Sequence, residues 1–276
     1  MRPDIKKSYF PIDYHMHTNF SADGYNEPEE MILASINKGL RSICFTDHQD
    51  KELFEDGREL IFEPNAYFNA LIPLKEKYAD QIQVRIGVEI GMQPHLNSYF
   101  EKLTNDYPFD FVIGSSHTIN GIDPYYRTIF EGQKDGTVYG WYFKELLEDV
   151  LVTADFDVLG HLDYIVRYGF QREKEYSYKL FSDEIDAILK AVIEKGKGIE
   201  INTAGLKYGL PFAHPHLEVI KRYRQLGGEI ITVGADAHKT EHVAYDFHVV
   251  KDLLREAGFA YYTEFVERKP YFCAVE

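Results

Sequence analysis

Short apolar runs alternate with longer amphipathic stretches along most of this chain of 276 residues. An apolar run of about four to eight residues is typical of a buried strand, and apolar residues three or four positions apart are typical of a helix. The predicted strands are 10–17, 42–46, 82–89, 109–115, 156–159, 199–202 and 229–234, with a further short strand at 259–263. The predicted helices are 28–38, 66–78, 142–152, 182–195, 217–226 and 252–257.

This alternation predicts parallel βα units, because parallel strands need a long crossover connection, which is usually a helix. Seven or eight such units favour a closed α/β barrel over an open sheet. No Gly-x-Gly-x-x-Gly motif opens a helix, which disfavours a dinucleotide-binding fold. The chain has no repeat, long linker or change of composition, so a single domain over residues 1–276 is expected.

Two connections between the predicted elements are unusually long. Residues 49–65 follow the second strand, and residues 118–136 follow the fourth. Loops as long as the second one usually carry function. The second one contains Tyr125 and Tyr126, whose rings are suited to stack on an imidazole.

The formal net charge of -15 argues against a surface that holds nucleic acid, which normally carries clustered Lys and Arg. A small anionic substrate is compatible with this charge, because bound cations and one or two arginines at a site outweigh distant, screened surface charge. The expected partner is therefore a small phosphorylated metabolite. The sequence carries no signal for a particular oligomeric state.

Three further features bear on the location of the protein. No apolar run approaches the ~20 residues needed to span a bilayer, so no membrane partner is expected. Residues 1–8 lack the apolar core and cleavage site of a signal peptide, so we expect a cytoplasmic protein. Cys44 and Cys273 are too few for a disulfide framework, and neither lies in the Cys-x-x-Cys spacing of zinc sites.

Residues able to bind metal ions stand at the C-terminal ends of six predicted strands. In a parallel barrel these ends meet on one face, where active sites are built. A single histidine at such a place usually has an ordinary structural role, but here six of the 11 histidines occupy such positions. The candidate ligands are His15, His17, His48, Glu89, His117, His161, Asp236 and His238.

Imidazole and carboxylate ligands suit zinc, manganese or iron, whereas the absence of cysteine thiolates argues against a structural zinc site. The set is larger than one ion can use, which favours a cluster of two or three metal ions with Glu89 as a bridge. Asp23 either adds a carboxylate to this cluster or forms a turn with Gly24, since Asp-Gly is a strong turn signal.

The ordered motifs His15-Met16-His17, Thr46-Asp47-His48, Glu89, His117, His161 and Asp236-Ala237-His238 resemble those of the PHP (polymerase and histidinol phosphatase) superfamily of metal-dependent phosphoesterases. Within it, residues 13–18, 113–117, 202–209 and 234–238 are similar to the monofunctional histidinol-phosphate phosphatases. The resemblance implies a distorted (β/α)7 TIM-like barrel and a trinuclear metal centre.

The resemblance also implies ligand sets. They are His15, His17, Glu89 and Asp236 for one metal, Asp23, His48 and His238 for a second, and Glu89, His117 and His161 for a third. Some relatives have histidine where this chain has Asp23.

The implied activity is hydrolysis of L-histidinol phosphate to L-histidinol and phosphate, in which a water molecule acidified by the cations attacks phosphorus. The leaving alkoxide needs a proton, for which Asp236 and His238 are both candidates.

Four more residues have two interpretations each. Arg127 and Arg167 follow ligand-bearing strands and either clamp the substrate phosphate or form ordinary surface ion pairs. Glu200 and Asn202 end the sixth strand, where they either meet the amine or imidazole of the substrate or hydrogen-bond the ligand histidines.

Two other functions compete with this one. Another PHP phosphoesterase, acting on nucleotides, on phosphotyrosine in proteins or on phosphomonoesters in general, would use the same ligands. A non-catalytic PHP module of a polymerase is disfavoured, because the ligand set is complete and no polymerase region is attached.

Overall fold

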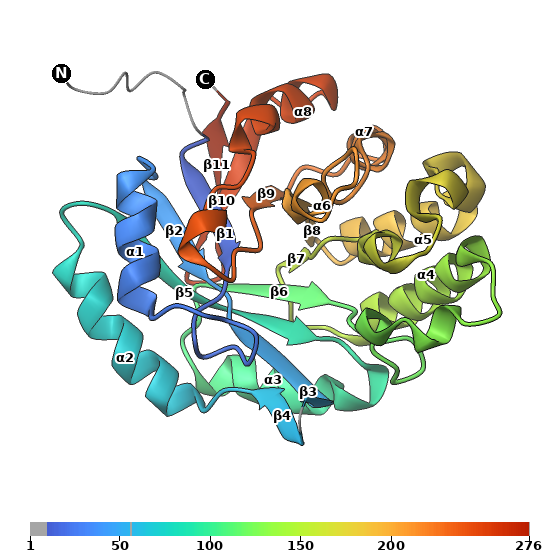
Figure 1. The fold of residues 1–276 in the computed structure, drawn as a ribbon. Coiled ribbons are helices and arrows are strands. Elements are labelled where there is room, and N and C mark those ends of the chain that lie inside the picture. Colours follow the sequence, from blue (N-terminus) through green and yellow to red (C-terminus); the bar gives the residue numbers. More distant parts are fainter. Residues whose placement is uncertain (1–9, 56, 276) are drawn as a thin grey trace.

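The computed structural model of the chain describes residues 10–55 and 57–275 (Figure 1). Seven parallel strands follow one another around a nearly closed, distorted barrel, which confirms the predicted α/β fold. In their order around the barrel they are β1 (Ile12–Met16), β2 (Ser42–Phe45), β5 (Gln83–Gly91), β6 (Phe111–Ser115), β7 (Val158–Leu159), β8 (Gly198–Asn202) and β9 (Ile231–Gly234). Residues 1–8, in which the sequence predicts no signal peptide, lie outside the described residues.

The hydrogen-bonded ladder is interrupted between β1 and β9. Within the described residues, backbone hydrogen bonds join this pair of strands only beyond the end of β9: Asp236 N donates to His15 O at 2.8 Å, and His17 N donates to Ala237 O at 2.9 Å. The barrel is therefore closed by hydrogen bonds at its C-terminal mouth, where Ala235 N also donates to the Asp13 carboxylate at 3.0 Å.

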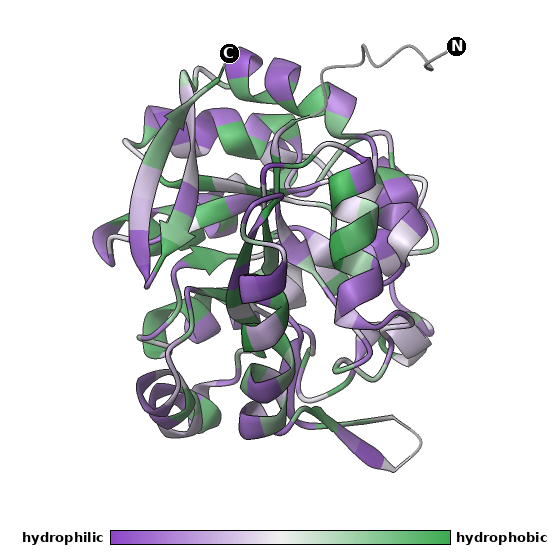
Figure 2. Cartoon of the chain, turned by 90° about the vertical axis from the view of Figure 1, so that its left-hand side faces the viewer, coloured by the Kyte–Doolittle hydropathy of each residue, from purple (hydrophilic) through white to green (hydrophobic). Residues whose placement is uncertain are grey.

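Helices surround the barrel, and hydrophobic residues dominate the barrel strands while the helices carry both kinds of residue (Figure 2). Parallel barrel strands are covered on both faces, which explains their nearly continuous apolar runs. None of the helices in the described part of the chain combines the length and apolar character that a bilayer-spanning helix needs. The helices are α1 (Pro28–Asn37), α2 (Pro64–Lys77), α3 (Asn97–Asp106), α4 (Asp135–Val152), α5 (Ser182–Glu194), α6 (Ala204–Lys207), α7 (Leu217–Gln225) and α8 (Val250–Glu256).

The long connection predicted at 49–65 contains two strands that the prediction missed. Most of this segment belongs to an antiparallel hairpin of β3 (His48–Glu55) and β4 (Arg58–Ile61), and β3 continues the sheet by pairing with β5. Charged residues alternate with only a few apolar ones here, which conceals the strand pattern. The Asp-Gly pair at 56–57 is a hairpin signal that the prediction passed over.

Three other elements differ from the prediction. Helix α3 was not predicted, because its sequence is polar apart from a narrow apolar stripe that includes Phe100 and Leu103. Helix α4 begins at Asp135 rather than at residue 142. The eighth predicted strand is not part of the barrel: β10 (Tyr261–Val266) pairs with β11 (Lys269–Ala274) in a separate two-stranded sheet. This sheet packs at the N-terminal end of the barrel, where Arg268 N donates to Asp110 O.

A buried carboxyl group on α4 predicts a pH dependence of stability. Burial raises the pKa of Asp149 from 3.8 to about 7, although the nearby Ser116 hydroxyl lowers it. Between these values the folded chain holds a proton that the unfolded chain has released, so stability falls as pH rises from about 4 to 7. Asp149→Asn should therefore raise the melting temperature at pH 8 and leave it nearly unchanged at pH 4. A melting temperature at pH 8 that the substitution does not raise would contradict this assignment.

Candidate metal centre

The first two histidines lie where β1 ends, and both are fully buried. Side chains in a strand repeat with period two, so His15 and His17 point to the same side. Their Nε2 atoms lie 3.1 Å apart. Two imidazoles therefore face one point in the mouth of the barrel.

Glu89 lies at the centre of the cluster, on β5, and is fully buried. One carboxylate oxygen is 3.2 Å from Nε2 of His15, and the other is 3.0 Å from Nε2 of His161. Burial alone would raise the pKa of Glu89, but the surrounding histidines hold it well below its usual value, so this side chain is anionic. The histidines with a ring nitrogen within 3.5 Å of a Glu89 oxygen are His15, His17, His48, His117 and His161.

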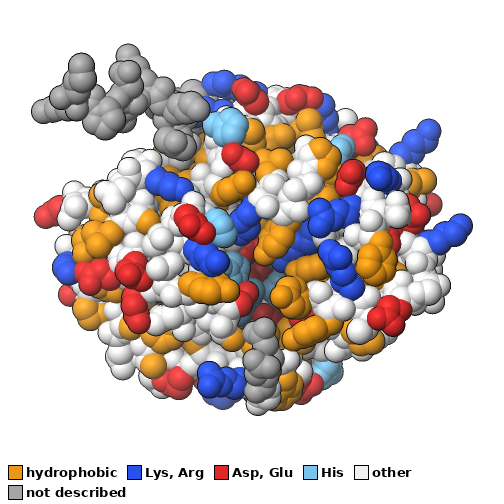
Figure 3. Space-filling view, in the orientation of Figure 1, with side chains coloured by type: hydrophobic (Ala, Val, Ile, Leu, Met, Phe, Trp, Pro, Cys, Tyr) orange, Lys and Arg blue, Asp and Glu red, His pale blue; other side chains and the backbone are white. Residues whose placement is uncertain are grey.

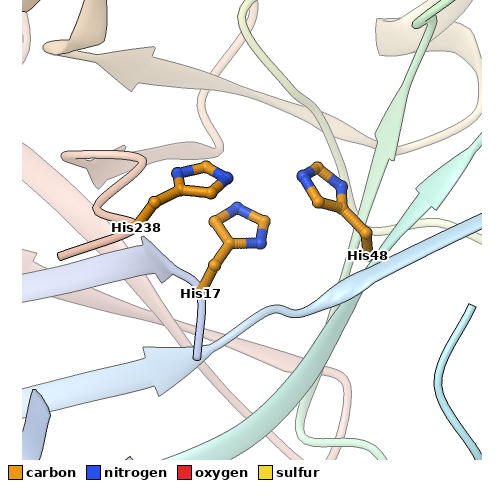
Figure 4. A group of neighbouring side chains, drawn as sticks. All are labelled: His17, His48 and His238. Atoms are coloured by element: carbon orange, nitrogen blue, oxygen red, sulfur yellow. The ribbon is translucent and has the colours of Figure 1, made fainter. Parts of the chain in front are cut away.

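Asp236 and His238 complete the cluster from the segment after β9. Asp236 Oδ1 lies 3.5 Å from His17 Nε2 and 3.4 Å from His238 Nδ1. His238 Nε2 lies 3.0 Å from one oxygen of Asp23, whose other oxygen is 3.8 Å from His48 Nε2. His17, His48 and His238 converge from three segments of the chain (Figure 4). The nine predicted ligands thus lie in one group of contacting side chains.

The donor set fits divalent metal ions. His48 Nδ1 and His238 Nε2 are buried and each lies 3.0 Å from a carboxylate oxygen, yet neither contact has hydrogen-bond geometry. Buried nitrogens and oxygens that approach without hydrogen bonding suit a shared cation, and imidazoles with carboxylates suit zinc, manganese or iron. Combinations of three donors with mutually close ligand atoms recur across the cluster, including His17, His48 and His238.

The protonation tendencies of the histidines differ. Burial and the neighbouring His238 and His48 hold the pKa of His17 well below its usual value, which leaves a neutral imidazole able to bind metal. Burial also lowers the pKa of His161. Burial would lower the pKa of His117 too, but Asp50 and Glu89 raise it to about 10. Metal binding at His117 should therefore release a proton.

Asp50, a residue that the sequence prediction missed, hydrogen-bonds His117 and lies close to His48. Its Oδ1 lies 2.8 Å from His117 Nδ1, and its Oδ2 lies 3.0 Å from His48 Nδ1. Carboxylates in such places orient imidazoles toward a metal ion. The sequence carried a signal, because Asp50 follows His48 by two residues and so lies on the same face of β3.

Glu200 and Asn202 lie beside the ligand histidines, which favours a role in hydrogen-bonding them over contact with the substrate. Glu200 Oε1 lies 2.7 Å from His15 Nδ1, and its Oε2 accepts hydrogen bonds from His161 N and Asn202 Nδ2 at 3.1 Å each. Both residues are buried and neither lines the cavity described below. They hold the ring of His15 in place.

A cavity of about 560 Å³ opens over the cluster. Histidine and acidic side chains lie at the bottom of a hollow whose edge carries both hydrophobic and basic side chains (Figure 3). Asp123, which the sequence prediction also missed, lies in the wall. Burial raises the pKa of Asp123, and the charge of the nearby Arg167 lowers it. The aromatic lining residues are Tyr25, Phe54, Tyr125, Tyr126, Tyr164, Tyr168 and Tyr208.

The two arginines that the sequence singles out occupy different places. Arg167 lines the cavity and is only 8% exposed, with its guanidinium 4.1 Å from the ring centre of Tyr164 and Nη1 3.5 Å from an oxygen of Asp236. Arg127 is not among the lining residues, and its guanidinium lies 5.7 Å from the ring centre of Phe170. The structure brings only Arg167 to the candidate site.

Gly234 at the end of β9 leaves the space that His15 occupies. A Cβ atom on Gly234 would lie 2.2 Å from His15 Cβ and 2.5 Å from an oxygen of Glu200. We expect Gly234→Ala to lower the free energy of unfolding by about 1–3 kcal/mol, the usual cost of overpacking, and to weaken metal binding because His15 must move. Thermal denaturation and metal analysis measure both effects. Gly136→Ala is the control, since a Cβ atom there meets only ordinary contacts at 3.6 Å or more.

Comparisons with known proteins agree with this geometry. Residues 13–204 match the family model of the PHP domain. A probable histidinol-phosphatase of Clostridium acetobutylicum is 35% identical over 236 residues, which cover 86% of this chain and 89% of that protein. A histidinol-phosphatase of Lactococcus lactis is 32% identical over 90% of this chain and 91% of its own length.

A solved structure is also similar. The crystal structure of histidinol phosphate phosphatase from Lactococcus lactis, in complex with zinc, L-histidinol and phosphate, has a TM-score of 0.85 and 30% sequence identity with this chain. The match covers 95% of this chain and 98% of that one. The likeness therefore extends over both proteins almost entirely.

Proposed function

This chain belongs to the PHP domain family, and from that premise we propose that it is a metal-dependent phosphatase that hydrolyses L-histidinol phosphate to L-histidinol and phosphate. The observation that carries the proposal is the cluster of nine imidazole and carboxylate side chains at an open cavity, beside a buried arginine. The similarity to histidinol-phosphatases, at 32–35% identity, supports L-histidinol phosphate as the substrate. The reaction is a step of histidine biosynthesis.

Two or three divalent ions of zinc, manganese or iron would occupy the cluster, and the zinc in the similar structure supports this choice. When bound, such ions withdraw charge from the phosphoryl oxygens and make water a stronger nucleophile. Glu89 is suited to bridge them, because its two oxygens face different groups of histidines. The ligands would be His15, His17, Asp23, His48, Glu89, His117, His161, Asp236 and His238.

Arg167 would bind the phosphate of the substrate. Its guanidinium is buried, faces the cavity and is held among tyrosine rings, and it matches phosphate oxygens bidentately. Burial alone would raise the pKa of the nearby Asp236, but cationic groups, His15 above all, hold it well below its usual value. Asp236 is therefore a poor proton donor, and His238 is the better candidate to protonate the leaving oxygen.

The outer wall would bind the rest of the substrate. Tyr125, Tyr126 and Tyr208 offer aromatic faces for the imidazole ring. Asp123 offers a carboxylate for the ammonium group. Burial raises the pKa of Asp123, and a bound ammonium group would favour its charged form.

The proposed domain organisation is a single domain over residues 1–276. The described helices and strands enclose one hydrophobic core, which includes residues from β1, from α8 and from the sheet of β10 and β11. No second core separates from it among the described residues.

Substrate comparison tests the proposed function. The purified protein, loaded separately with zinc, manganese and iron, is assayed with L-histidinol phosphate, a nucleoside monophosphate, phosphotyrosine and 4-nitrophenyl phosphate. We expect L-histidinol phosphate to have the highest kcat/KM and activity to disappear with a chelator and return with metal. A higher kcat/KM for the nucleotide or for phosphotyrosine would overturn the assignment of L-histidinol phosphate as the substrate. A protein that binds no metal after metal-replete expression would overturn the proposal that it is a metal-dependent enzyme.

A further inference from the structure

The segment 202–209 contributes no proposed metal ligand, but it carries a lysine, Lys207, that lies close to one. Residues 204–207 form the single helical turn α6 immediately after β8. Thr203 N donates to Gly234 O at 2.9 Å, and Asn202 Oδ1 accepts a hydrogen bond from Ala204 N at 2.9 Å. The turn is therefore fixed between the ends of β8 and β9, beside the segment that carries Asp236.

Lys207 reaches from this turn to the metal centre. Its Nζ donates a hydrogen bond of 2.7 Å to the backbone carbonyl of Asp236. Across residues 10–55 and 57–275, no carboxylate oxygen lies within ion-pair distance of this Nζ. Burial lowers the pKa of Lys207, while the charge of Asp236 raises it. The hydrogen bond to the Asp236 carbonyl is therefore the polar contact that fixes this ammonium group.

The peptide that receives this hydrogen bond has an unusual backbone. Asp236 has a φ of +52°, in the left-handed region that residues with a side chain rarely adopt. Such a conformation is strained and persists only where its surroundings hold it. Asp236 N donates to His15 O, and its carbonyl also lies 3.1 Å from Nδ1 of His238. Lys207 supplies the charged donor in this arrangement.

The left-handed turn determines where the Asp236 carboxylate lies. From it, Oδ1 faces Nε2 of His17 at 3.5 Å and Oδ2 faces Nη1 of Arg167 at 3.5 Å. A change in this backbone conformation would move the carboxylate relative to both partners. A charged donor holds a carbonyl more strongly than a neutral group does.

We propose that Lys207 is a positioning residue, whose ammonium group holds the Asp236 carbonyl so that the Asp236 carboxylate stays directed at the metal centre. The proposal rests on the proposed function in one respect, namely that Asp236 binds a metal ion. Lys207 itself touches neither metal nor substrate. Its effect should therefore appear in metal affinity before any substrate is added.

Metal titration tests this inference. Metal-free protein is titrated with Zn²⁺ against a chromophoric chelator, and the visible spectrum of the Co²⁺-loaded protein is recorded for each variant. Lys207→Met keeps the length of the side chain and removes the donor, and Lys207→Arg restores one. Lys197→Met is the matched control, because burial also lowers the pKa of Lys197, which lies just before β8 at the opposite end of the barrel.

We expect Lys207→Met to raise the zinc dissociation constant at least about tenfold and to change the Co²⁺ spectrum, as for other residues that orient metal ligands. Lys207→Arg should recover most of the affinity, and Lys197→Met should match the wild type. Wild-type zinc affinity in Lys207→Met overturns the inference, whatever happens to its melting temperature. Equal weakening by Lys197→Met also overturns it, because the effect would then follow from lost charge alone.

Two further results separate this inference from the function on which it rests. A wild-type protein without zinc affinity overturns the proposed function, and unchanged affinity in Asp236→Asn overturns the assignment of Asp236 as a ligand. If the wild type binds zinc, Asp236→Asn weakens that binding and Lys207→Met fails to fold, Lys207→Gln replaces Lys207→Met. Wild-type affinity in Lys207→Gln and Lys207→Arg together then overturns the positioning role.

Discussion

Glu89→Gln should reduce kcat/KM for L-histidinol phosphate about 1000-fold, because bound metal ions stabilise the transition state by several kcal/mol and each 1.36 kcal/mol is a factor of ten. Glu89 has oxygens within 3.5 Å of five histidines, so its charge holds the cluster together. Glutamine has the same shape and lacks the charge. Kinetic assays and metal analysis of the purified variant measure the effect, and we expect less metal per chain.

The barrel itself should survive this substitution, which circular dichroism checks. Glu256→Gln is the control, since Glu256 lies on α8, is 60% exposed and pairs with Lys221. We expect it to have wild-type kinetics. A Glu89→Gln protein with full metal content and activity within about tenfold of wild type would refute the bridging role, since a lost bridge costs several kcal/mol.

Arg167→Met should lower kcat/KM about 10- to 100-fold, since a hydrogen bond to a charged group contributes about 1.5–3 kcal/mol. The guanidinium lies in the cavity wall, and Tyr164 and Tyr208 hold its plane in place. Arg167→Lys should not restore activity, because an ammonium group cannot replace a planar, bidentate donor. Inhibition by inorganic phosphate measures the same contact without turnover and should weaken in parallel.

Arg127→Met is the matched control for this prediction, because its guanidinium lies against Phe170 outside the cavity. We expect nearly unchanged phosphate inhibition. Metal analysis of Arg167→Met is also needed, since Arg167 lies 3.5 Å from Asp236. Unchanged phosphate inhibition in Arg167→Met would remove Arg167 from phosphate binding.

The barrel and the clustering of the proposed ligands could be predicted because both follow from strand topology. Once the apolar runs are recognised as parallel strands, residues as distant as His15 and His238 must meet at one end. Strand alternation also places His17 beside His15. This reasoning needs only the order of the strands, so small errors in the predicted strand boundaries do not change the predicted cluster.

Residues in the connections could not be placed in this way. Arg127 and Arg167 look alike in the sequence, but tertiary packing turns one toward Phe170 and the other into the cavity. Asp123 belongs to a connection whose path depends on contacts that no local pattern encodes. Asp50 was hidden because the strand that carries it, β3, reads as a polar loop.

The interrupted ladder between β1 and β9 has a consequence for unfolding. Proposed metal ligands stand on both sides of this seam, with His15 and His17 on one and Asp236 and His238 on the other. Ions bound there would fasten the first strand of the barrel to the last, much as a covalent cross-link does. The first strand could then leave the barrel only by giving up metal, so the lifetime of the folded chain would follow the free metal concentration around it.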